Sequence, residues 1–170
     1  MKTKYFILAF LISIVNISKT KEINKDNVII GINCGGEEFE GHDGVIYQED
    51  NYFNKGTPSD YGIQYEISHT KDEELYQTER WADGDLTYSI PFDALPGKYI
   101  VILKFSEVYF SSVDEKVFDI ALGSKIIIND LDIYERVGKA KAHDEYIEFS
   151  INDDKKLVYI VSKLQIILIY

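Results

Sequence analysis

An apolar run without a polar interruption, residues 99–103 (YIVIL), constrains the fold of this chain more than any other stretch. A strand that is apolar on both faces belongs in the middle of a core. Two neighbouring aromatics, Tyr109 and Phe110, follow soon after it. Adjacent strand residues point to opposite faces, so two rings that share one surface must sit where the strand gives way to a loop. The segment predicts a central strand that displays two rings at a sheet end, with burial of both rings as an equal alternative.

Short apolar or alternating segments separated by Gly, Pro, Asn and Asp recur along the rest of the chain. One segment, residues 129–138, has a capping residue and a stopping glycine and is the single helix that we expect. Many short strands and little helix predict an all-β fold, a β-sandwich. Besides the strand at 99–103, strands are expected at 27–34, 44–47, 75–81, 86–92, 117–122, 124–128 and 146–151.

Charge and cysteine content exclude several classes of protein. The formal net charge is -11 and the basic residues are scattered, so nucleic acid and anionic membrane surfaces are poor partners. Cys34 is the single cysteine, and an internal disulfide is therefore excluded. Stability must come from the packing of one domain of ordinary size.

The N-terminus resembles a secretory signal peptide. Lys2 and Lys4 precede an apolar stretch, residues 5–15, that is too short to span a bilayer. We expect a signal peptide over residues 1–20, a mature chain that starts near residues 19–24, and one domain over residues 24–170.

Motifs for catalysis are not evident. Pairs of acids such as Glu79 and Glu107 suggest a glycoside hydrolase, but chance pairs are expected among 29 acidic residues. The three histidines lie far apart without metal-ligand spacing. We therefore expect no enzyme activity, no metal and no cofactor.

Aromatic residues beside polar ones are the remaining candidates for a site: Tyr61, Trp81, Tyr109 and Phe110. Sugars present apolar C–H faces and a rim of hydroxyls, so a sugar site needs flat aromatic surfaces and a few fixed polar groups. Asp60, Glu79 and Glu107 are the candidate hydrogen-bonding residues, and each could equally be a structural cap. Spacing alone does not bring these residues together.

Several motifs occur in the order seen in the malectin family, and together they cover about residues 28–151. They are INCGG (32–36), SDYG (59–62), LYQTER (75–80), LKFSEVYF (103–110), KVFDI (116–120), DLDIYERVG (130–138) and AHDE (142–145). The resemblance implies a jelly-roll-like β-sandwich and a lectin of the endoplasmic reticulum lumen that binds glucosylated high-mannose N-glycans. It implies a ribophorin subunit of the oligosaccharyltransferase as a partner.

The same resemblance implies that the glucose-binding aromatics are Tyr61, Trp81, Tyr109 and Phe110. Family members have Tyr where this chain has Trp81, a change that keeps the ring surface and loses a hydroxyl. Malectin-like domains also occur in cell-surface proteins, so a structural or protein-interaction module is the main alternative. Exposed, converging rings would favour a lectin, and buried rings would favour the module.

The C-terminal segment departs from the family pattern. Residues 164–170 replace the expected further strands, a GYxDNP-like segment with a ligand-binding Asp, and a transmembrane helix. We therefore expect a sandwich that lacks its C-terminal strands and a membrane anchor. An unpaired sheet edge would then make the chain marginally stable, because residues 166–170 are apolar without alternation.

Overall fold

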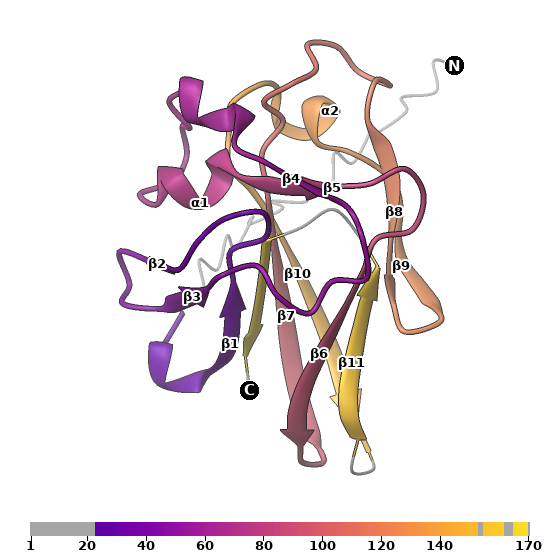
Figure 1. Ribbon diagram of the computed structural model, residues 1–170. Helices are drawn as coiled ribbons and strands as arrows, with labels where there is room; N and C mark the ends of the chain where they lie inside the picture. Colours follow the sequence, from indigo (N-terminus) through magenta and orange to yellow (C-terminus); the bar gives the residue numbers. More distant parts are fainter. Residues whose placement is uncertain (1–22, 153–154, 162–164, 170) are drawn as a thin grey trace, which may run out of the picture.

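The computed structural model describes residues 23–152, 155–161 and 165–169. Two mainly antiparallel sheets face each other (Figure 1). One sheet has the order β10 (His143–Ile151), β7 (Gly97–Phe105), β12 (Gln165–Ile169), β1 (Val28–Ile32), β3 (Ile46–Gln48) and β2 (Phe39–Glu40). The other has the order β6 (Thr87–Ala94), β11 (Lys155–Val161), β8 (Val117–Leu122) and β9 (Lys125–Asp132). The expected all-β sandwich is confirmed.

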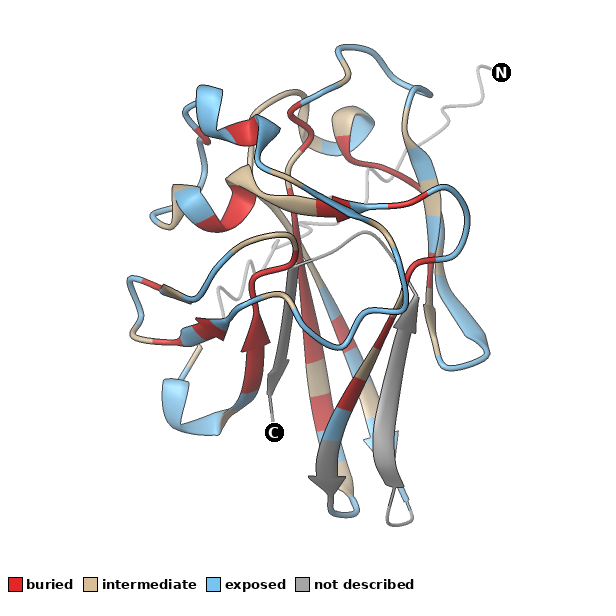
Figure 2. Ribbon diagram, in the orientation of Figure 1, coloured by how far each residue is buried: buried red, intermediate tan, exposed pale blue. Residues whose placement is uncertain are grey.

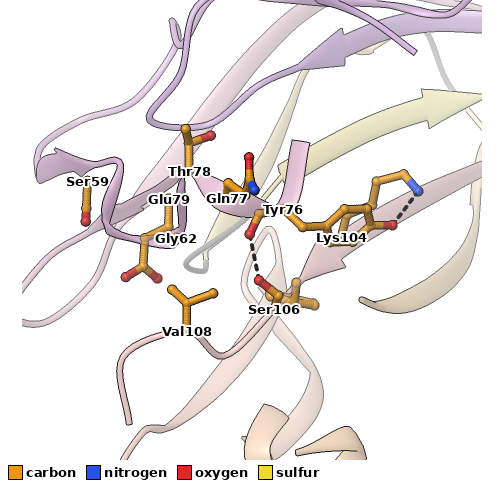
Figure 3. Close-up of a pocket in the computed structure, with 10 residues that line it drawn as sticks. Ser59, Gly62, Tyr76, Gln77, Thr78, Glu79, Lys104, Ser106 and Val108 are labelled. Carbon is orange, nitrogen blue, oxygen red and sulfur yellow. Dashed lines mark hydrogen bonds between the residues drawn. The ribbon is translucent and has the colours of Figure 1, made fainter. Parts of the chain in front are cut away.

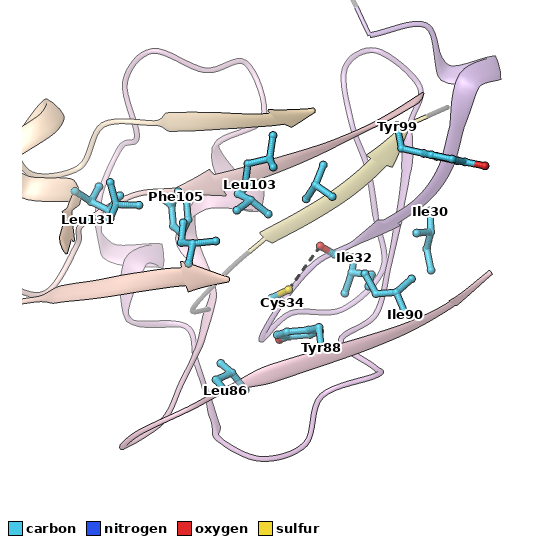
Figure 4. Packing of buried hydrophobic residues seen from close by; sticks show 14 of the residues in the cluster. Ile30, Ile32, Cys34, Leu86, Tyr88, Ile90, Tyr99, Leu103, Phe105 and Leu131 are labelled. Carbon is cyan, nitrogen blue, oxygen red and sulfur yellow. Dashed lines mark hydrogen bonds between the residues drawn. The ribbon is translucent and has the colours of Figure 1, made fainter. Parts of the chain in front are cut away.

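Strand β7 is central to the packing, as its apolar run predicts. Tyr99, Val101, Leu103 and Phe105 are buried between the two sheets, together with residues of β1, β6, β8 and β9 (Figures 2 and 4). Ile102, one step out of phase with them, is buried in a second cluster on the outer face, beside Tyr47 and Leu75. Because alternate residues of a strand point to opposite faces, an uninterrupted apolar run lets β7 contribute to both clusters.

Strand β12 corrects the expectation that the C-terminal segment cannot serve as a paired strand. It pairs antiparallel with β1 on one side and with β7 on the other, Ile167 lying opposite both Gly31 and Ile102. An apolar segment without alternation is what an interior strand requires, and that is the position that it takes. The expected signal peptide lies outside the described residues.

The segment 75–81 was expected to be one strand, and the structure corrects this. Helix α1 (Glu73–Gln77) is followed by the short strand β5 (Glu79–Trp81). Acidic residues in its first turn favour a helix, and Leu75 and Tyr76 are buried against the outer cluster. Sheet pairing to β4 (Thr57–Ser59) begins only at Glu79.

The helix expected at 129–138 is present, with its stop at Gly138, but it begins later than expected. Strand β9 continues to Asp132, whose side chain then accepts a hydrogen bond from the Glu135 amide and begins helix α2 (Ile133–Val137). Gly138, with φ of 83°, ends it. Two 3-10 segments, η1 (Lys25–Asn27) and η2 (Tyr61–Gln64), complete the helical elements of the described chain. None of the helices in these described ranges is long and apolar enough to cross a membrane.

One end of the sandwich gathers the irregular elements. The β4–β5 ribbon, helices α1 and α2 and the loop between β7 and β8 lie together at the top of Figure 1, away from the turn between β6 and β7. The side chains considered next come from these elements.

Candidate functional site: an aromatic groove

The four predicted aromatic residues line one groove of about 410 Å³, together with Ser59, Glu79, Asp83 and Lys116. Tyr61 begins η2, Trp81 ends β5, and Tyr109 and Phe110 lie in the loop after β7. The ring centroids of Tyr61 and Tyr109 are 5.2 Å apart, and those of Tyr109 and Phe110 are 5.0 Å apart. Tyr61 and Trp81 are each 41% exposed and Tyr109 is 58% exposed, while Phe110 is half-buried. The rings therefore present a shared aromatic surface to solvent.

The β4–β5 ribbon places one wall of the groove. Ser59 lies opposite Glu79 in the ladder, and Glu79 and Trp81 point to the same face because they are two residues apart. The residue between them, Arg80, is buried and forms an ion pair with Asp50. Arg80 also donates to the Gly56 carbonyl at 2.7 Å. Strand alternation thus anchors the ribbon through Arg80 and leaves its neighbours facing the groove.

The loop that carries Tyr109 and Phe110 is shaped by Glu107. This carboxylate is buried, and its Oε1 accepts hydrogen bonds from the backbone amides of Tyr109 at 2.8 Å and Phe110 at 3.0 Å. The Glu107 carbonyl accepts a further bond from the Ala140 amide. One side chain therefore turns the backbone so that two adjacent rings can share a surface, which a continuing strand would forbid.

Lys116 joins the two walls. Its ammonium lies 3.0 Å from Glu107 Oε2 and 3.2 Å from Glu79 Oε2, and 5.8 Å from the centroid of the Phe110 ring. Burial alone would lower the pKa of Lys116, but the two carboxylates outweigh it and raise the pKa above its ordinary value. Lys116 therefore stays charged and paired, and it ties the Trp81 strand to the Tyr109–Phe110 loop.

Three further side chains hold the rest of this loop through five hydrogen bonds. Glu115 Oε2 accepts from the amides of Ser111 and Ser112, and Asp132 accepts from the Asp114 amide at 2.6 Å. The Lys139 ammonium donates to the Tyr109 carbonyl and the Ser111 hydroxyl. These contacts fix the loop without using a groove-lining side chain.

The three predicted polar residues do not all lie in the groove. Glu79 lines the groove, whereas Asp60 is exposed at the start of η2 and Glu107 is buried behind the loop. Of the two roles left open for Glu107, its contacts are those of a structural cap. Sequence reasoning missed Ser59, Asp83 and Lys116 as lining residues. The one available signal was the position of Lys116 in an otherwise acidic stretch.

A small cavity of about 30 Å³ lies behind β5 and shares Ser59 and Glu79 with the groove (Figure 3). Ser106 donates to the Tyr76 carbonyl at 2.6 Å beside it, and the Lys104 ammonium donates to the Tyr76 hydroxyl. A space of this size has room for water but is too small for a sugar. Within the described ranges, no group of three His, Cys, Asp or Glu side chains is arranged to hold a metal ion.

Comparisons with known proteins identify the family of the chain. The malectin domain model matches residues 28–166. The chain belongs to the malectin family. It is 41% identical over 133 residues to Malectin-A of Xenopus laevis, which covers 76% of this chain and 48% of that protein. The corresponding identity to Malectin of Homo sapiens is 40%, over 76% of this chain and 45% of that protein. The chain thus spans about half the length of the malectins that it matches.

Solved structures with the same fold are more distant in sequence. The ANXUR2 extracellular domain from Arabidopsis thaliana superposes with a TM-score of 0.72 at 17% identity, covering 83% of this chain and 48% of that one. A β-glucuronidase from Bacteroides uniformis superposes with a TM-score of 0.66 at 22% identity, covering 83% of this chain and 18% of that one. Both likenesses show the sandwich fold alone.

Proposed function

We propose that this malectin-family domain is a lectin that binds a glucose-containing oligosaccharide in the groove formed by Tyr61, Trp81, Tyr109 and Phe110. The supporting observation is the convergence of these four rings on one groove, three of them well exposed. Exposed, converging rings favour this function over a purely structural module, in which the rings would be buried. Exposed apolar grooves mark binding sites for ligands or for other proteins, so sugar binding must be measured directly.

The physical match is between flat rings and the apolar C–H face of a pyranose. Tyr and Trp supply large contact areas with little loss of conformational freedom, and their polar tips can bond to hydroxyls. Glu79 lines the groove with one oxygen on Lys116, so its other oxygen is available to accept a bond from a sugar hydroxyl. Ser59 adds a hydroxyl on the same wall.

The binding that we propose is non-catalytic. A glycoside hydrolase needs two carboxyl groups that flank the scissile bond, one of them able to give up a proton. Glu79 and Glu107 instead share the Lys116 ammonium, and Glu107 is buried with both oxygens bonded inside the protein. The arrangement supports a binding site in preference to a hydrolase.

Family membership supports a finer proposal. The ligand would be a glucosylated high-mannose N-glycan in the lumen of the endoplasmic reticulum, and a ribophorin subunit of the oligosaccharyltransferase would be a partner. Trp81 stands where family members have Tyr, so we propose that the ring surface is kept while the preferred sugar differs.

Removing single rings tests the proposed function. Trp81→Ala or Tyr109→Ala should weaken binding of maltose and of glucose-α1,3-glucose by about 1–3 kcal/mol, the scale of an aromatic anchor lost from a site. Isothermal titration calorimetry measures the affinity, and thermal melts confirm that each variant folds. Tyr146→Ala is the control, because Tyr146 is 50% exposed on β10 and does not line the groove. Unchanged affinity in both folded groove variants would rule the site out.

A further inference from the structure

Acidic side chains outnumber basic ones among the residues that line the groove. Glu79 and Asp83 are acidic, and Lys116 is the one basic residue among the described lining residues. The Lys116 ammonium is within 3.2 Å of Glu79 and 3.0 Å of Glu107, and its side chain is mostly buried. One positive charge therefore faces two carboxylates, and this cluster keeps a net charge of about -1.

Two lysines lie near the groove without lining it, and the positive charge of Lys139 is felt at Tyr61. The Lys139 ammonium donates to the Tyr109 carbonyl at 3.3 Å and to the Ser111 hydroxyl at 3.2 Å. The Lys55 ammonium donates to the Asp83 carbonyl at 3.0 Å. Both are committed to loop structure and neither lines the groove. The Asp83 side chain itself is exposed and adds a second negative charge at the groove.

A site that takes an anionic sugar normally offers an Arg or Lys whose N–H groups can reach the carboxylate. Here the ammonium that could do so is already held by two carboxylates of the protein. A uronic acid would have to displace one of them and would also meet the charge of Asp83. A neutral sugar faces neither cost and can bond to the free oxygen of Glu79.

We propose that the groove discriminates against carboxylated sugars, and that Glu79, through its ion pair with Lys116, is the residue that determines this selectivity. The inference rests on the proposed function and adds a specificity to it.

The test compares maltose with the α1,4-linked disaccharide whose non-reducing glucose carries a carboxylate at C6. Trp81 is the only tryptophan in the sequence and lines the groove, so its fluorescence reports directly on binding. At low ionic strength we expect the carboxylated sugar to bind about tenfold more weakly, as for like charges about 6 Å apart at an effective dielectric constant of about 40. The ratio of the affinity for maltose to the affinity for the carboxylated sugar should fall toward one as salt is raised, because salt screens exposed charges.

Variants locate the effect. Glu79→Gln leaves Lys116 paired with Glu107 alone, so the ratio of the two affinities should move toward one, even if maltose itself binds more weakly. Glu148→Gln is the matched control, since it removes the same charge from an exposed position near the other end of β7. If Glu79→Gln does not fold, Asp83→Asn is the substitute, because it removes a groove charge from an exposed side chain. It should also move the ratio of the two affinities toward one.

The outcomes are distinguishable. Weaker binding of the carboxylated sugar that depends on salt and on Glu79 supports the inference. Equal or tighter binding of the carboxylated sugar would overturn it and leave the lectin function standing. Failure of the folded protein to bind either sugar would overturn the lectin function together with the inference.

Discussion

The Glu107 carboxylate contacts both walls of the groove, one directly and one through Lys116. Its Oε1 binds the amides of Tyr109 and Phe110, and its Oε2 binds the ammonium that also holds Glu79. A buried carboxylate is costly unless each oxygen is bonded, and here both are. The residue therefore fixes ring positions without facing the ligand space.

Truncation of Glu107 tests this role. Glu107→Ala should reduce the free energy of unfolding by about 3–5 kcal/mol, because it breaks a buried ion pair and leaves two amides without their acceptor. Urea denaturation followed by circular dichroism measures the change. Glu66→Ala, at an exposed position, should stay within about 0.5 kcal/mol of the original. A loss below about 1 kcal/mol for Glu107→Ala would contradict the structural role.

The identities of the groove aromatics could be predicted from the sequence, but the role of Glu107 could not. Ring type and polar neighbours mark Tyr61, Trp81 and the 109–110 pair as candidates, and the structure brings them together. A glutamate two residues before a ring looks the same in sequence whether it faces a ligand or its own backbone. Only the direction of its side chain distinguishes the two.

At the scale of elements, the groove depends on how closely η2 packs on the last residue of helix α1, Gln77. Gly62, beside Tyr61, is buried, and a Cβ added there would lie 2.4 Å from the Gln77 carbonyl oxygen. The contact is with backbone, so the neighbour cannot rotate away. Glycine permits this approach because it has no side chain.

Gly62→Ala should therefore displace η2 and Tyr61. We expect a loss of stability of about 1–3 kcal/mol, as for overpacking, together with weaker maltose binding. Gly123→Ala is the control: its φ is +63° and nothing lies within 4 Å, so it should cost about 1–2 kcal/mol of backbone strain without changing affinity. Thermal melts and calorimetric titration of both variants decide this, and an unchanged affinity in Gly62→Ala would contradict the packing argument.

Strands with strong patterns were predictable, and elements set by tertiary contacts were not. The strand over 117–122 has the boundaries expected from its sequence. Helix α1 was missed because its single turn has too few residues for a periodic pattern, and it is stabilised by burial of Leu75 and Tyr76. Strand β12 was misjudged because an apolar segment indicates burial but does not say which strands will flank it.

At the scale of the whole molecule, the stability of the folded protein depends on pH through its buried tyrosines. Burial, with contributions from nearby titratable groups, raises the pKa of Tyr47, Tyr76 and Tyr88 well above the ordinary value of 10.0. Above about pH 10 the unfolded chain loses these protons while the folded chain keeps them, so stability falls as pH rises.

An alkaline titration checks this expectation. Phenolate absorbance and circular dichroism, followed together from pH 8 upward, should show part of the 13 tyrosines ionising only as the sheets unfold. In concentrated urea all of them should titrate in one step near pH 10, as free phenols do, within about one unit. Complete ionisation before any loss of β-structure would contradict the burial of these three rings.

Strand β12 joins the two parts of the six-stranded sheet, because it lies between β7 and β1. Ile167→Pro should destabilise the protein by about 3 kcal/mol or more, because proline removes a backbone donor from a strand that is paired on both sides. Ile167→Val keeps that donor and is the matched control. Urea denaturation compares the two, and equal midpoints would show that β12 is not an interior strand.

The position of β12 also sets an order of events during synthesis. Val28–Ile32 leaves the ribosome early, but one of its two neighbouring strands is Gln165–Ile169. At about 5–20 residues per second, roughly 7–27 s pass between the translation of Ile32 and that of Gln165. Throughout that interval, β1 lacks its partner on the edge that β12 will occupy. Completion of the sheet, and with it the support for the loop at the end of β7, must therefore follow translation of almost the whole domain.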